Sequence, residues 1–330
     1  MSIWNYKILK DHFCYLNNFF TKSEGDTPVE KFTLNNNQTI FIKREDKNPF
    51  GSWKDRASAL KVSILKNTNN NLGVIASSGN AAFSYINYFN EFFPEFKLYI
   101  LLSPNVNKDK LNRLNFVIKG TKHEIIIDKN PFKHINKIKQ LGGVDLRSSF
   151  DRDVEKAYWT LGIEISKLLT IKNGQNLDTG IFVPVSSGTA IIGIVEGLMY
   201  SLEDEFMLPR IYAVQTNYNY PLVIENLDEI VNSNIYTFPL FDQIQKENNT
   251  LADAIYNPRC IKGKKIIKII KDTQGGIIVI DNKDLVYAKQ FLSEKLKINE
   301  NISYNSLVSL SAFLKSNLGL KKNIIVFSGY

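Results

Sequence analysis

Short apolar runs alternate with stretches of helical periodicity along most of this chain. Runs rich in β-branched and apolar residues predict strands at about 31–34, 38–43, 73–76, 98–102, 124–127, 144–146, 181–185, 210–214, 276–280 and 323–327. Helical periodicity predicts helices at about 81–92, 107–118, 131–141, 153–170, 189–203, 261–272, 283–297 and 305–317. This order of elements predicts an α/β fold, in which helices cover both faces of mostly parallel sheets.

Length and composition narrow the classes of function. The 330 residues are 44% hydrophobic and contain neither a transmembrane run nor a signal peptide, so we expect a cytoplasmic protein without a membrane partner. The two cysteines and three histidines lack metal-binding spacing, so we expect no metal site. The net charge of +8 comes from lysines spread over the whole chain, which does not favour a nucleic-acid partner.

One lysine lies at a predicted junction between a strand and a helix. Pro49 and Gly51 mark a turn before the helical pattern at 57–65, and Ser52 is suited to be the N-cap of that helix. Lys54 then falls in the first turn, where the helix dipole disfavours a positive charge. A neutral amine can form an imine with an aldehyde cofactor. The alternative is a surface lysine beside Asp55 and Arg56.

The stretch Asn-Pro-Phe-Gly-Ser-Trp-Lys-Asp-Arg at 48–56 resembles the Asn-Pro-Thr-Gly-Ser-Phe-Lys-Asp-Arg segment of threonine synthase and its relatives, the fold type II pyridoxal phosphate enzymes. The resemblance implies that pyridoxal 5'-phosphate is the cofactor and that Lys54 carries it as a Schiff base. It extends to Glu-Gly-Asp-Thr-Pro at 24–28, to Thr-Leu-Ala-Asp-Ala-Ile at 250–255 and to the strand at 275–281. In all it covers about residues 22–330.

The loop Ala-Ser-Ser-Gly-Asn-Ala-Ala at 76–82 follows a predicted strand. Small residues let a ligand approach the backbone, and amides at a helix start attract an anion. A plain helix cap is the alternative. The loop resembles the family's Ser-Thr-Gly-Asn segment, which implies that Asn80 meets the cofactor ring. The residues implied for the substrate carboxylate are Ser77, Ser78, Gly79 and Ala81.

A second loop, Pro-Val-Ser-Ser-Gly-Thr-Ala at 184–190, resembles the family's Pro-Val-Gly-Ser-Gly-Gly-Thr phosphate cup. The residues implied for the cofactor phosphate are Ser186, Ser187, Gly188, Thr189 and Ala190. Two family glycines are replaced by Ser186 and Thr189, and the terminal Thr by Ala190. Backbone binding survives these changes if no positive φ is required at the substituted positions.

The apolar C-terminal strand ends in Ser328-Gly329. Family members place a Ser or Thr here to bond the pyridine nitrogen, and the resemblance gives this role to Ser328. A neutral hydroxyl does not keep the ring nitrogen protonated as a carboxylate does. This favours elimination and replacement over transamination.

We therefore expect a smaller domain at 48–150 and a larger one made of 1–47 and 151–330, with the cofactor in the cleft and a homodimer as the assembly. The expected reaction is β/γ-elimination or replacement on an amino acid by a lyase or synthase. A serine or threonine dehydratase or a diamino-acid ammonia-lyase would share every cofactor residue. A non-catalytic scaffold that binds pyridoxal phosphate would keep the fold without turnover.

The resemblance weakens where threonine synthases bind the substrate phosphate. They carry a stretch like Asn-Pro-Phe-Arg-Ile-Glu-Gly-Gln-Lys-Thr ahead of a helix that ends in Glu-Ile. With Glu164-Ile165 as the anchor, the Arg position falls on Val154 and the Lys position on Trp159. We therefore expect a substrate other than O-phosphohomoserine, although Arg147 or Arg152 would restore a cation after a small shift in register.

Overall fold

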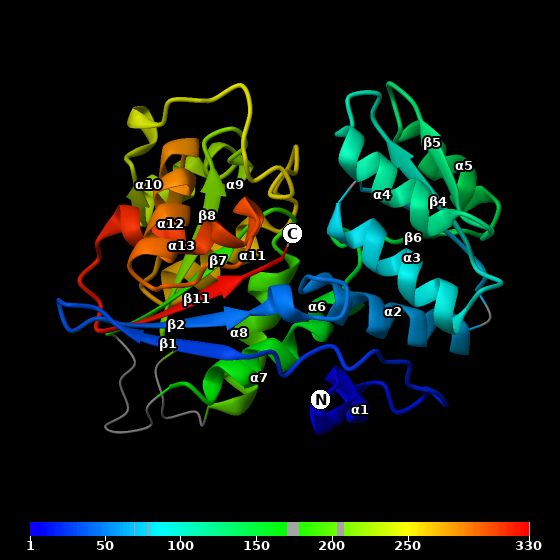
Figure 1. Cartoon of the computed structure of the whole chain (residues 1–330), viewed down its shortest axis with the longest axis horizontal. Helices are drawn as coiled ribbons and strands as arrows, with labels where there is room; N and C mark the ends of the chain where they lie inside the picture. The colour runs from blue at the N-terminus through cyan, green and yellow to red at the C-terminus, as the bar shows by residue number, and fades with distance from the viewer. Residues whose placement is uncertain (69, 78, 170–177, 203–207, 330) are drawn as a thin grey trace. The chain divides into compact units, whose positions relative to one another are not determined.

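The computed structural model describes residues 1–68, 70–77, 79–169, 178–202 and 208–329, which divide into two compact units (Figure 1). Unit 1 comprises Met1–Asp26 and Asn48–Ala157. Unit 2 comprises Thr27–Lys47 and the chain from Tyr158 onward.

Unit 1 is built on a four-stranded parallel sheet with the strand order β5-β4-β3-β6. Ile135 and Ile138 pack on Val74 and Leu101, so one helix, α5, covers one face of this sheet. Helix α3 packs against α2 and α4. The elements are η1 (Ile3–Asn5), α1 (Lys7–His12), α2 (Lys54–Asn67), β3 (Leu72–Ala76), α3 (Asn80–Phe92), β4 (Lys97–Leu102), α4 (Lys108–Ile118), β5 (Glu124–Ile127), α5 (Lys133–Gln140), β6 (Val144–Asp145) and α6 (Asp153–Ala157).

The boundaries of unit 1 differ from those expected from the sequence, because segments on both sides of 48–150 bond to α2. The backbone N–H of Phe20 donates to Ser63 Oγ at 2.9 Å, which holds the N-terminal segment against the helix. Lys61 forms a buried ion pair with Asp151 at 2.7 Å, and α6 packs against α2. Residues 1–26 and 151–157 therefore lie in unit 1.

Unit 2 contains a seven-stranded sheet with the order β1-β2-β11-β7-β8-β10-β9, parallel except for the hairpin β1-β2. Its elements are β1 (Val29–Thr33), β2 (Thr39–Arg44), η2 (Glu45–Lys47), α7 (Trp159–Ser166), β7 (Thr179–Pro184), α8 (Thr189–Ser201), β8 (Arg210–Thr216), α9 (Pro221–Ile224), α10 (Leu227–Asn232), β9 (Tyr236–Phe238), η4 (Phe241–Gln243), α11 (Gly263–Asp272), β10 (Gly276–Ile280), α12 (Asn282–Glu294), α13 (Tyr304–Ser316) and β11 (Lys322–Phe327).

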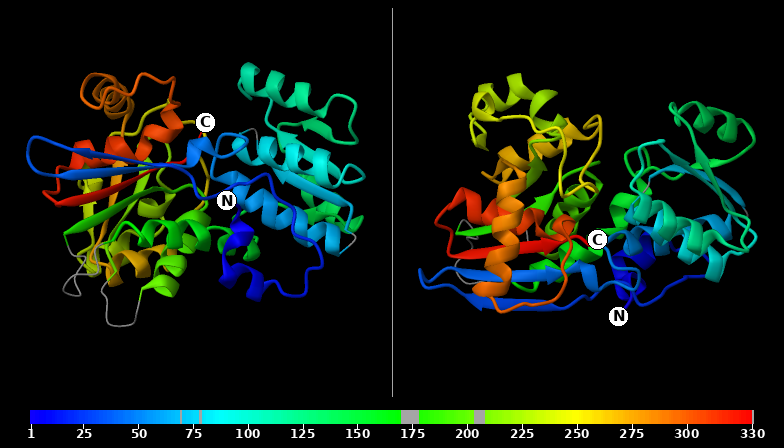
Figure 2. Two further views of the ribbon diagram at one scale, coloured as in Figure 1. Left: turned by 60° about the horizontal axis from the view of Figure 1, so that its bottom comes forward. Right: turned by 45° about the horizontal axis from the view of Figure 1, so that its top comes forward.

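Helices α12 and α13 lie on one face of the sheet of unit 2, as Figure 2 also shows. Apolar residues of both helices form one buried cluster with Ile42, Phe182, Ile280 and Phe327 of the strands. Helix α11 packs on β8 and β10 and against α8, and α8 packs against α7. The central strands β7 and β10 are thus buried on both faces of the sheet, which explains why they are almost entirely apolar.

The predicted α/β fold is confirmed, and each predicted strand has a counterpart. Some features differ from the prediction. The short elements α1, α9, α10 and β9 were not predicted. The predicted helix at 153–170, whose last residue lies outside the described residues, is divided into α6 and α7 where unit 1 ends and unit 2 begins. No helix in the described part of the chain has the length and apolar character needed to cross a membrane.

Candidate functional site

Lys54 is the first residue of α2, directly after the Pro-Phe-Gly-Ser turn of unit 1. Gly51 has a φ of +85°, a conformation that favours glycine. The N-cap position is Trp53 rather than the predicted Ser52, whose Oγ accepts a hydrogen bond from the Lys54 N–H at 3.3 Å. Lys54 is half-buried, as expected for a residue that reaches a ligand from the start of a helix.

The buried carboxylate of Asp55 fixes the turn before Lys54. It accepts from the N–H of Phe50 at 2.6 Å and from the hydroxyl of Ser84 at 2.5 Å. Ser84 lies on α3, the helix that begins with Asn80. One side chain therefore connects the lysine turn with the helix that carries the second predicted segment.

The predicted segment at 24–28 also begins beside the lysine turn. Asn48 Oδ1 accepts from the N–H of Gly25 at 2.9 Å, and Gly25 has a φ of +98°. The buried Glu24 accepts from the hydroxyl of Tyr88 on α3 at 2.7 Å. Burial raises the pKa of Tyr88, and the negative charge of Glu24 raises this pKa further, so the phenol stays a donor. These bonds bring two segments that are distant in sequence into contact within unit 1.

The loop between β3 and α3 presents donors at the start of a helix. Gly79 is the N-cap of α3 and, as a glycine, offers no capping side chain of its own. Ser77 Oγ accepts from the Gly79 N–H at 3.4 Å, and Ser77, Gly79, Asn80 and Ala81 are all half-buried. Ser78 lies outside the described residues. Amide N–H groups at a helix start suit an anion such as a carboxylate.

In the loop between β7 and α8, the residues that replace family glycines do not need a positive φ. Gly188 is the N-cap of α8 with a φ of +80°, whereas Ser186 and Thr189 do not have a positive φ. The left-handed conformation therefore falls on a retained glycine. A Cβ at Gly188 would also lie 2.5 Å from Ile266 Cδ1 on α11, so a larger residue here would displace the end of that side chain.

Two hydroxyls and one ammonium group meet at the start of α8. Ser187 Oγ and Thr189 Oγ1 are 3.0 Å apart, and Lys262 Nζ donates to Thr189 Oγ1 at 3.0 Å. Ser186 Oγ donates to the carbonyl of Tyr256 at 3.0 Å. Lys262 was not predicted, because no local pattern distinguishes it from the neighbouring lysines of α11. Helix amides, hydroxyls and an ammonium group fit a phosphate.

Ser328 lies directly after β11 and is 4% exposed. The parallel register pairs Ile325 with Phe182, so Ser328 and Val185 come the same number of positions later on neighbouring strands. Ser328 and the loop after β7 are therefore at the same edge of the sheet. The Ser328 hydroxyl donates to the carbonyl of Asn305 at 3.2 Å, so its proton would have to turn toward the ring to bond an unprotonated pyridine nitrogen.

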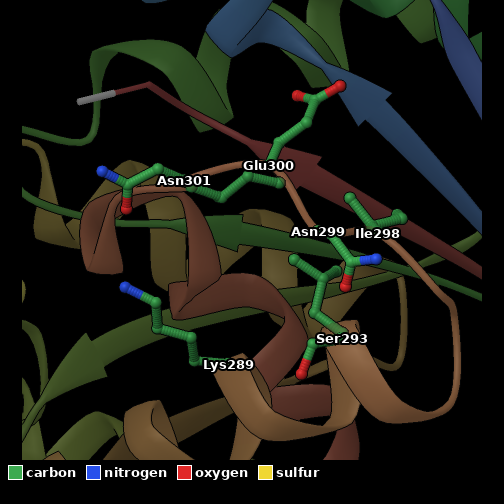
Figure 3. Close-up of a pocket in the computed structure, with 8 residues that line it drawn as sticks. Lys289, Ser293, Ile298, Asn299, Glu300 and Asn301 are labelled. Carbon is green, nitrogen blue, oxygen red and sulfur yellow. The ribbon is translucent and has the colours of Figure 1, made fainter.

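A separate pocket of about 290 Å³ lies beside α12 and is shown in Figure 3. Lys289 and Glu300 are among its lining residues, and none of the candidate residues above is. Glu300 pairs with Lys47 and with Arg44, each at 2.7 Å, and these bonds lower the pKa of Glu300 to about 2. The carboxylate is thus held by cations of unit 2, which gives it a structural role.

Comparisons with known proteins show the family and the fold of this chain. A family model described as "Pyridoxal-phosphate dependent enzyme" matches residues 20–329. A pyridoxal 5'-phosphate-dependent aspartate racemase superimposes with a TM-score of 0.69 at 18% identity, covering 100% of this chain and 95% of that one. Maize serine racemase superimposes with a TM-score of 0.69 at 18% identity, covering 99% of this chain and 93% of that one. The O-acetylserine dependent cystathionine beta-synthase of Helicobacter pylori superimposes with a TM-score of 0.69 at 17% identity, covering 93% of each chain. No curated protein sequence matches this chain.

Proposed function

This chain belongs to the family of pyridoxal-phosphate dependent enzymes with fold type II, and from that premise we propose that it catalyses elimination or replacement at the β or γ carbon of an amino acid. Its cofactor is pyridoxal phosphate, which supplies an electron sink for the substrate when it is bound. The remaining tasks fall to side chains and amides of the chain itself.

Four features hold the cofactor in this proposal. Lys54 attaches it covalently, and the loop at 186–190 binds its phosphate through amides and hydroxyls. Asn80 bonds the phenolic oxygen, and Ser328 bonds the ring nitrogen. The donor set at the start of α8 and the position of Lys54 at the start of α2 support these roles.

Lys54 also acts as the base in this proposal. Once the substrate amine has replaced it, its free amine removes the proton from the α carbon. Asp55 keeps the amine in place, because its two short hydrogen bonds fix the turn on one side of Lys54 and α3 on the other. Ser77, Gly79 and Ala81, with Ser78, bind the substrate carboxylate, so that the α proton faces the lysine.

The buried neutral hydroxyl of Ser328 is the observation that favours elimination or replacement. It donates to the carbonyl of Asn305, and a hydroxyl does not stabilise a protonated ring nitrogen as a carboxylate does. The electron sink is then weaker, which disfavours transamination.

The substrate in this proposal carries no phosphate group. Arg147, one of the two arginines that could replace the missing cations, contacts Asp145 through Nε at 3.0 Å and Nη2 at 2.7 Å. At the family's Lys position, Trp159 donates its indole N–H to Glu196 at 2.7 Å. A phosphate dianion needs charged donors, so serine, threonine, an O-acylated serine or a diamino acid fits better.

The test has two parts. The purified protein is supplied with the cofactor, reduced with borohydride and mapped, and we expect the label on Lys54; label on Lys43 or Lys61 would contradict the assignment. The protein is then incubated with L and D amino acids, O-acetylserine, diaminopropionate and O-phosphohomoserine, while the spectrum, keto acid and ammonia are recorded.

Keto acid and ammonia without an added nucleophile would identify a dehydratase or ammonia-lyase. A new amino acid would identify a synthase, and exchange of L and D forms alone would identify a racemase. Efficient release of phosphate from O-phosphohomoserine would overturn the substrate class. A spectral shift without turnover in any assay would indicate a non-catalytic binding protein.

A further inference from the structure

The loop that replaces the phosphate cup has a cation beside it. Lys262 Nζ lies 3.0 Å from Thr189 Oγ1, and that hydroxyl lies 3.0 Å from Ser187 Oγ. The three polar groups thus form a continuous set at the first residue of α8, where the helix dipole is positive.

The stem of Lys262 is held in place by the packing around Gly188. A Cβ at Gly188 would lie 3.4 Å from Lys262 Cβ and 2.5 Å from Ile266 Cδ1, so the start of α11 lies directly on the N-cap of α8. Lys262 is itself the N-cap residue of α11 and is half-buried. The start of α11 therefore fixes the point from which the Lys262 side chain reaches the loop.

We propose that Lys262 is a binding residue for the cofactor phosphate, donating from Nζ to a phosphate oxygen at the loop of 186–190. This inference rests on the proposed function, because it takes that loop as the phosphate site. A hydroxyl set with a helix N-terminus binds a phosphate without full charge compensation, whereas an ammonium group adds a charge-assisted hydrogen bond. Thr189 takes the place of a family glycine, and its hydroxyl holds the lysine over the loop.

The test compares two ligands on the full-length apoprotein: pyridoxal phosphate and pyridoxal, which lacks the phosphate. The variant Lys262→Met removes the charge and keeps a side chain of similar length. We expect the dissociation constant of pyridoxal phosphate to rise roughly tenfold to a hundredfold, since one charge-assisted hydrogen bond is lost. The dissociation constant of pyridoxal should stay unchanged.

Lys265→Met is the matched control. Lys265 is on the same helix and pairs with Glu196 at 2.7 Å, so its loss changes the net charge equally without touching the loop. We expect wild-type affinity for both ligands. An equal loss with Lys265→Met, or an equal loss of pyridoxal affinity with Lys262→Met, would overturn the role of Lys262.

Two further results distinguish a direct contact with the phosphate from an indirect effect through Thr189. The effect of Lys262→Met should persist in a Thr189→Ala background; its disappearance there would mean that the lysine only orients the threonine. In the bound state, ³¹P NMR should give the phosphate a higher second pKa in Lys262→Met than in the wild type, and equal values would contradict the contact. Equal affinity of the wild type for both ligands would mean that the loop at 186–190 does not bind the phosphate. That result would overturn the proposed function itself and not only the role of Lys262.

Discussion

Two glycines offer a matched substitution that tests the structure of the candidate site. Gly188 and Gly79 are the N-cap residues of α8 and α3, two helices of 13 residues each, and as glycines they offer no capping side chain of their own. Gly188 has a φ of +80°, and a Cβ there would lie 2.5 Å from Ile266 Cδ1. Gly79 has a φ of −110°, and a Cβ there would meet nothing within 4 Å.

The two Gly→Ala variants share the change in capping and the change in unfolded-chain entropy, so these contributions cancel in the comparison. At Gly188 the left-handed conformation costs an alanine roughly 1–2 kcal/mol. The overlap with Ile266 Cδ1, the end of a side chain that can shift, adds the cost of a displaced rotamer, about 0.5–1.5 kcal/mol. We therefore expect Gly188→Ala to lower the free energy of unfolding by about 1.5–3.5 kcal/mol more than Gly79→Ala does.

Hydrogen exchange read by mass spectrometry suits this comparison, because it reports peptides of α8 and of α3 separately within the full-length apoprotein. Gly188→Ala should lose protection in α8 and α11 and bind pyridoxal phosphate more weakly, since the start of α8 is strained and the end of Ile266 must shift. Gly79→Ala should retain protection in α3 and wild-type cofactor affinity. Wild-type protection in α8 of Gly188→Ala, or an equal loss in both variants, would refute the argument from φ and packing.

Three other expectations concern Ser328, Asp55 and His123. Ser328→Asp should favour protonation of the ring nitrogen and raise the share of transamination, whereas unchanged spectra and turnover in both this variant and Ser328→Ala would place the hydroxyl away from the ring. Asp55→Ala removes two bonds to a buried carboxylate and should lower the free energy of unfolding by about 3–6 kcal/mol in denaturant titrations, against roughly half of that for Ser84→Ala, which removes one of them. Burial lowers the pKa of His123 to about 4, so the unfolded chain binds the proton more readily, and unit 1 should lose about 3 kcal/mol of stability as the pH falls from about 6.5 to about 4. His123→Leu should flatten this pH dependence in unfolding or exchange measurements, and an unchanged slope would contradict a neutral buried imidazole.

The parts of the fold that depend on local pattern could be predicted from the sequence. The central strands β7, β10 and β11 are mainly apolar because they are buried on two faces, so these runs were visible in the chain. The turn before Lys54 was visible because Pro49 fixes φ and Gly51 allows a positive φ, which the structure shows at Gly51. Both kinds of signal are carried by a few neighbouring residues.

Features that depend on contacts between distant segments could not be predicted. Helix α7 packs so closely on α8 that a Cβ at Gly162 would lie 2.1 Å from the carbonyl oxygen of Ile194, and one at Gly197 would lie 2.1 Å from that of Trp159. Helical periodicity does not reveal which of two helix glycines faces another backbone. The place of the N-terminal 26 residues in unit 1 escaped prediction for a similar reason, since their bonds to α2 come from polar residues without a pattern.

Lys262 shows how such a contact changes the meaning of a local motif. By itself, the loop at 184–190 resembles a phosphate cup in which two glycines and a threonine are replaced. In the fold, α11 lies against its N-cap glycine, and this contact brings a lysine to the hydroxyl that replaced one of those glycines. Thr189 therefore removes the flexibility of a glycine and at the same time provides the acceptor that holds the ammonium group. Because Thr189 and Lys262 are far apart in sequence, the loop by itself shows only the replaced glycine. The lysine that we propose as an additional phosphate ligand becomes visible only where α8 and α11 meet.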